Sequence, residues 1–95
     1  MVTSNEPGVY RPGRWGVRIE NLILNVPDET TEFGEFLRFE TLTLCPIDTR
    51  PIERALLTAE EIAWLDDYHA TVRRRLAPHV AGAAREWLER RTQPL

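Results

Sequence analysis

The first half of the chain alternates apolar and polar residues with the period of a β-strand. Val2–Glu6 predicts a short strand, and Gly16–Val26 predicts a longer one whose two faces differ by parity. Phe36–Leu44 is rich in aromatic and β-branched residues and predicts a third strand, which Pro46 ends.

Two segments between these strands have the composition of connections. Residues 7–13 contain two Pro and two Gly, which favours turns. Pro27–Glu35 is polar and contains a glycine, so we expect an exposed, disordered connection there.

The second half of the chain has helical periodicity. Thr58 followed by Glu61 matches a capping box, and apolar positions then recur at helical spacing through residue 76. Pro78 and Gly82 interrupt this pattern, and a shorter amphipathic segment follows at Ala83–Arg91. The predicted fold class is therefore α+β, a small antiparallel sheet followed by two C-terminal helices.

Length and composition restrict what such a domain can do. A chain of 95 residues makes one small domain, in which a deep active-site cleft is not expected. Hydrophobic residues at 42% and charged residues at 28% exclude a disordered chain and a collagen-like repeat. All twelve basic residues are Arg and the net charge is −3, which argues against a nucleic-acid partner.

The same sequence contains no sign of export or membrane insertion. Cys45 is the single cysteine, so no disulfide forms within the chain. No apolar run approaches the roughly 20 residues of a membrane span, and the N-terminus lacks a signal sequence. We expect a cytoplasmic protein with no membrane partner.

Glu6 and Glu20 are the strongest candidates for chemistry. Each ends or lies within a predicted strand, and the turn between them can bring both carboxylates together across a hairpin. Paired carboxylates in a sheet are costly unless they are protonated or bound to cations, and a metal ion removes that cost. The alternative is two exposed strand glutamates, one of them paired with Arg18 on the same strand face.

Other conspicuous residues have structural interpretations. His69 and His79 lie in or beside the helices, and we assign neither to a site. Arg73–Arg75 favours a solvated, charged helix end, and Cys45 has the character of a small buried hydrophobe. The three Trp residues favour core positions over interface anchors.

Two segments resemble a known family. SNEPGVY at 4–10 and GVRIEN at 16–21 are similar to the last two metal-ligand strands of the pita-bread metallopeptidases, which include Xaa-Pro aminopeptidase, prolidase, creatinase and methionine aminopeptidase. FLRFETLTLCPID at 36–48 and LLTAEEIAWLDDYHATV at 56–72 resemble the C-terminal extension of the larger Xaa-Pro aminopeptidases (aminopeptidase P). The resemblance covers essentially the whole chain.

The resemblance implies roles for four residues. Glu6 matches the glutamate that ligates one of two divalent metal ions, usually manganese, and Glu20 matches the glutamate that bridges both. Arg18 matches the arginine two positions before the bridging carboxylate, and Tyr10 matches an aromatic residue near the site. Such a centre polarises a carbonyl and lowers the pKa of a shared water, which suits hydrolysis of the amide before a proline.

The resemblance also implies a division of the chain and an incomplete site. Residues 1–27 match the end of the pita-bread catalytic domain, its metal-ligand hairpin, and residues 28–95 match the C-terminal extension, with one strand and two helices. The family's remaining ligands, two aspartates and a histidine, are absent from these 95 residues. We therefore expect weak metal binding and no activity from the isolated chain, as part of an enzyme whose substrate is a peptide with proline at its second position.

A different class of function stays open. Strands taken from a larger sheet expose edges and apolar faces that a second copy can cover. On this alternative the chain is a standalone, non-catalytic interaction or dimerisation module that forms a homodimer.

Overall fold

The computed structural model describes all residues, 1–95, and divides them into two compact units, Met1–Thr43 and Leu44–Leu95. The resemblance suggests a boundary between residues 27 and 28, whereas the two compact units divide after Thr43. Strand β4 (Asn21–Thr31) is continuous across residues 27 and 28, so the chain does not divide there. No helix in either unit has the length and apolar character needed to cross a membrane.

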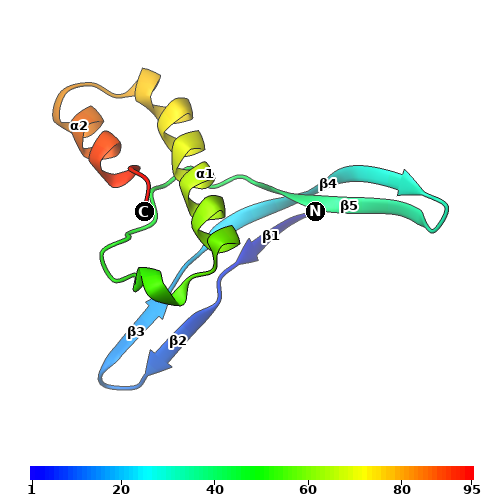
Figure 1. Ribbon diagram of the computed structural model, residues 1–95, viewed down its shortest axis with the longest axis horizontal. Coiled ribbons are helices and arrows are strands. Elements are labelled where there is room, and N and C mark those ends of the chain that lie inside the picture. Colours follow the sequence, from blue (N-terminus) through cyan, green and yellow to red (C-terminus); the bar gives the residue numbers. More distant parts are fainter. The chain divides into compact units, whose positions relative to one another are not determined.

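The first unit consists of antiparallel hairpins (Figure 1). A three-stranded sheet has the order β1-β4-β5, and β2 pairs with β3 alone. The bounds of the remaining strands are β1 (Val2–Asn5), β2 (Gly8–Arg11), β3 (Trp15–Arg18) and β5 (Gly34–Thr41). The predicted strands at 2–6 and 36–44 are thus confirmed within a few residues.

The β2–β3 hairpin turns tightly at a glycine. The Arg14 N–H donates a hydrogen bond of 2.9 Å to the Arg11 carbonyl, which closes the turn. Gly13 there has a φ of 71°, a left-handed conformation that glycine adopts at little cost. The stretch 7–13, predicted as turns alone, therefore includes strand β2.

Two further predictions for the first unit were wrong. The single strand predicted at Gly16–Val26 is two strands, β3 and β4, interrupted at Ile19 and Glu20. The disordered connection predicted at Pro27–Glu35 is instead a hairpin of β4 and β5, with a register shift between Pro27 and Thr30. Proline has no backbone N–H to donate to a β-ladder, which explains why the pairing becomes irregular after Pro27. Pairing with β5 outweighs the polar composition of the segment.

The second unit contains two α-helices, α1 (Ala59–Leu76) and α2 (Gly82–Arg91). Two short 3-10 helices, η1 (Arg54–Leu56) and η2 (Ala77–His79), precede and follow α1. The capping box is confirmed: Thr58 Oγ1 accepts a hydrogen bond from the Glu61 N–H, and Glu61 Oε2 accepts one from the Thr58 N–H. Both helices and the α+β class agree with the sequence prediction.

The core of the second unit lies where α1 and α2 meet the chain that precedes them. Tyr68, Val72 and Leu88 are buried together, and partly buried apolar residues pack around them: Leu44, Ile47, Leu76, Ala77 and Val80. Burial of such side chains contributes roughly 1.5–3 kcal/mol each to the stability of a fold. This small core is what holds the unit together.

Two predicted core assignments were wrong. Cys45 is exposed and not a buried hydrophobe. The three tryptophans are also about half exposed, Trp15 at 54%, Trp64 at 50% and Trp87 at 45%. The core instead uses Tyr68 and the neighbouring His69, which have one polar end each that finds a backbone partner.

Candidate metal centre

Glu6 and Glu20 lie opposite each other at an interruption between two ladders. Asn5 pairs with Asn21 at the end of one ladder, and Gly8 pairs with Arg18 at the start of the next. Each chain has two residues between these pairs, so the register continues across the interruption without a bulge. The Ile19 N–H still donates a hydrogen bond of 3.3 Å to the Pro7 carbonyl, which ties the two chains together there.

The continuing register puts both glutamates at one level and on one face. Directly paired residues of an antiparallel ladder share a face, and side chains two positions apart along a strand do so as well. Gly8 and Arg18 are such a pair, and Glu6 and Glu20 each lie two positions further along. The hairpin predicted from the sequence is therefore present, with Glu6 opposite Glu20 in its register.

Arg18 forms an ion pair with Glu20. Its Nε lies 3.3 Å from Glu20 Oε2, and the two side chains are 53% and 42% exposed. Exposed pairs of this kind contribute little to stability, typically below about 1 kcal/mol. The contact fixes the direction of the Glu20 carboxylate rather than holding the fold together.

Tyr10 lies on the same face, over two glycines. It pairs with Gly16 across the hairpin, and its ring occupies the space above Gly8 and Gly16. A Cβ built at Gly16 would be 2.7 Å from Tyr10 Cδ1, closer than atoms in contact approach. The Tyr10 ring can therefore pack against the backbone here because neither glycine has a side chain.

The donor set suits a hard divalent cation but is incomplete. Carboxylate oxygens are the ligands that such ions prefer, and Glu6 and Glu20 supply them. Nowhere do the 95 residues gather three or more His, Cys, Asp or Glu side chains able to hold an ion. The residues present fit part of a metal centre.

The histidines lie outside this hairpin. His69 is fully buried in the second unit, where its Nε2 accepts a hydrogen bond of 3.0 Å from the Ile47 N–H. Its Nδ1 is buried without a partner. His69 occupies an apolar position of the helical pattern, which was the sequence signal for its burial. His79 is exposed.

Comparison with known proteins bears on the whole chain. Residues 35–95 match the family model described as the C-terminal region of peptidase M24. The chain belongs to this family. The resemblance inferred from SNEPGVY at 4–10, from GVRIEN at 16–21 and from the sequence that follows them is confirmed.

Individual relatives extend the match to the N-terminal hairpins. A probable Xaa-Pro aminopeptidase P of Coprinopsis cinerea is 41% identical over 101 residues, covering 100% of this chain and 16% of the relative. Aminopeptidase P1 of Lotus japonicus is 43% identical over 99 residues, covering 100% of this chain and 15% of the relative.

A solved structure shares the fold of this peptidase M24 C-terminal chain. The X-prolyl aminopeptidase of Caenorhabditis elegans, described as a cytosolic enzyme with a di-nuclear active site, superposes with a TM-score of 0.84 at 35% identity. The match covers 99% of this chain and 16% of that one. The 95 residues thus span about one sixth of the length of the relatives they match.

Proposed function

We propose that this chain supplies Glu6 and Glu20 as two carboxylate ligands of a dinuclear centre in an Xaa-Pro aminopeptidase. The observation that carries the proposal is the unbroken register across the strand interruption, which sets the two glutamates opposite each other. The di-nuclear active site described for the C. elegans enzyme supports it. Manganese is the ion that we propose.

In this proposal Glu6 would hold one ion and Glu20 would be shared by the two. When bound, such a pair of ions would supply Lewis-acid polarisation of the scissile carbonyl and a water of lowered pKa. Arg18 keeps the Glu20 carboxylate directed through the 3.3 Å ion pair. Tyr10 borders the same face and offers its hydroxyl as a hydrogen-bond donor or acceptor to a bound peptide.

The substrate that we propose is a peptide with proline at its second position, from which the residue before proline is released. The names of the relatives support this choice. The remaining metal ligands belong to sequence outside these 95 residues, so the isolated chain is inactive. We propose a cytosolic enzyme, with residues 1–27 at the end of its catalytic domain and residues 28–95 as its C-terminal extension.

Paramagnetic broadening by manganese tests the ligand assignment in the chain itself. Titration with Mn²⁺ should broaden the backbone amide NMR signals around Glu6 and Glu20 first, even where binding is weak. Glu20→Gln should abolish this broadening, because glutamine keeps the size of the side chain and removes its charge. Glu35→Gln, an exposed change on β5, is the matched control and should leave it intact.

Two results would contradict the proposal. Equal broadening around Glu35 and around Glu20 would mean that the ions collect at any surface carboxylate. Hydrolysis of an Xaa-Pro peptide by the 95-residue chain with added Mn²⁺ would show that it needs no further ligands.

The second candidate, a non-catalytic interaction module, rests on exposed apolar side chains in the first unit. Val9, Val17, Leu37 and Phe39 each have more than half of their surface exposed on the strands. A second copy that covered these faces would form a homodimer. Sedimentation of a monomer at micromolar concentration would count against this candidate.

A further inference from the structure

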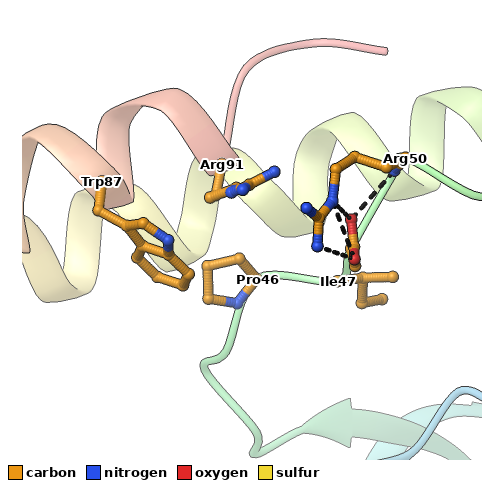
Figure 2. Close-up of a pocket in the computed structure, with 6 residues that line it drawn as sticks. Pro46, Ile47, Arg50, Trp87 and Arg91 are labelled. Atoms are coloured by element: carbon orange, nitrogen blue, oxygen red, sulfur yellow. Dashed lines mark hydrogen bonds and ion pairs between the residues drawn. The ribbon is translucent and has the colours of Figure 1, made fainter.

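A charged pocket lies in the second unit, between α2 and the extended chain that leads toward α1. Its volume is about 150 Å³, and Figure 2 shows Trp87 extending from α2 toward Pro46 and Arg91 extending toward Arg50. Asp48 and Arg50 complete the lining. The proposed metal centre is in the other unit and uses none of these residues.

Two of the three charges in this pocket neutralise each other. Arg50 Nη2 lies 2.7 Å from Asp48 Oδ2, and Arg50 Nε lies 2.9 Å from Asp48 Oδ1 (Figure 2). These hydrogen bonds from Arg50 hold the pKa of Asp48 well below its usual range. The carboxylate is therefore ionised, and the charge of Arg91 also lowers its pKa.

Arg91 is the charge left over. Its side chain is half-buried and makes no ion pair or hydrogen bond. Because the charges of Arg50 and Asp48 cancel, the pocket has one net positive charge. Two guanidiniums beside one carboxylate favour a further anion, and a carboxylate is the group that the planar fork of arginine matches best.

An apolar groove adjoins this charged pocket. The two share Pro46 and Trp87 as walls, and the groove has a volume of about 420 Å³. Its other lining residues are Leu44, Cys45, Leu76, Val80, Ala84 and Leu88. Apolar side chains can be buried here beside a single cationic end.

The walls of the groove are fixed before any ligand binds. The Tyr68 hydroxyl donates a hydrogen bond of 2.7 Å to the Cys45 carbonyl, and His69 Nε2 accepts one of 3.0 Å from the Ile47 N–H. Trp87 and Arg91 are four residues apart on α2 and so lie on one helix face. A site with preformed walls loses little conformational entropy on binding.

We propose that this groove binds a peptide segment of another protein in which apolar residues precede an acidic one. The apolar side chains occupy the groove past Trp87, and the acidic side chain forms an ion pair with Arg91. The charge complementarity selects the occupant, because the pocket beside the apolar groove contains two arginines and a single carboxylate.

Fluorescence anisotropy with a defined peptide tests this proposal. The probe is fluorescein-labelled Gly-Leu-Ile-Leu-Glu amide, and its control ends in Gln amide. We expect saturable binding of the Glu peptide by the 95-residue chain. Loss of a charged hydrogen-bonded pair weakens binding on the order of tenfold, so the Gln peptide should bind about that much more weakly.

Substitutions in the chain locate the site. Arg91→Gln should weaken the Glu peptide on the order of tenfold and leave the Gln peptide unchanged. Arg90→Gln is the matched control, since Arg90 is the adjacent, exposed residue and does not line the charged pocket. Trp87→Ala, checked for helix content by circular dichroism, should weaken both peptides.

Several outcomes would overturn the proposal. Absence of saturable binding, or equal affinity for the Glu and Gln peptides, would remove the role of Arg91. Equal losses from Arg90→Gln and Arg91→Gln would mean attraction to the surface as a whole. Self-association of the chain that Trp87→Ala abolishes would mean that a second copy occupies the groove.

Discussion

His69 Nε2 accepts a hydrogen bond of 3.0 Å from the backbone N–H of Ile47, inside the second unit and away from solvent. Only the unprotonated nitrogen can accept this bond. Burial lowers the pKa of His69 from its ordinary value of 6.5, an effect opposed by Asp66 and reinforced by Arg73. The neutral ring is thus part of the fold.

Acid should therefore destabilise the second unit. Below pH 6.5 the unfolded histidine takes up a proton while the folded one does not, so the free energy of unfolding decreases as pH decreases. We expect a lower urea midpoint at pH 5.5 than at pH 7.5. His69→Gln should flatten this dependence, whereas His79→Gln, at an exposed position, should keep it. A dependence that persists in His69→Gln would assign it to other groups.

The capping box gives a prediction for α1. Thr58→Ala removes the acceptor of the Glu61 N–H and should lower the free energy of unfolding by about 1 kcal/mol. Thr58→Ser keeps the hydroxyl and should restore most of the loss. Chemical denaturation followed by circular dichroism measures both. Equal losses from Ala and Ser would contradict a role for the hydroxyl.

The core should respond to truncation far more strongly than the surface. Leu88 is 4% exposed and belongs to the buried cluster, so Leu88→Ala should cost about 2–5 kcal/mol. Leu56→Ala removes the same atoms from a residue that is 82% exposed and should cost less than about 0.5 kcal/mol. Thermal or urea unfolding compares the two directly, and similar losses would show that Leu88 is not a core residue.

The ring of Tyr10 should move when Gly16 gains a side chain. Tyr10 is 59% exposed, so it can rotate away from a Cβ placed 2.7 Å from its ring instead of straining the backbone. The ring shields the Gly8 Hα protons from its place above them, and Gly16→Ala should abolish their upfield NMR shift. Val17→Ala, on the opposite face, should leave the shift intact. A shift unchanged by Gly16→Ala would mean that the ring is held elsewhere.

Local signals made the helices predictable. The capping box and the recurring apolar positions of α1 involve residues three or four apart, so the chain encodes them without distant partners. His69 lies at helical spacing from the buried residues Leu65 and Val72. The hydrogen bond between His69 and Ile47 joins residues 22 apart in the sequence, so helical periodicity alone could not predict it.

Strand boundaries depended on distant pairing and were predicted less well. Pro27–Glu35 has the composition of a loop, yet most of it pairs within the β4–β5 hairpin. Gly16–Val26 has the pattern of one strand, yet it breaks at Ile19 and Glu20 where the ladder changes partner. Strand propensity depends on context because neighbouring strands supply the hydrogen bonds.

The sequence by itself determined the α+β class, the two helices and the two glutamates that are candidates for a metal centre. Only the tertiary structure decided that Glu6 and Glu20 share one register level, and that Arg91 lines a charged pocket beside an apolar groove. The physical reason is that periodicity and capping act within a few residues. Ladder register, burial and the pairing of charges depend on which distant segments come into contact.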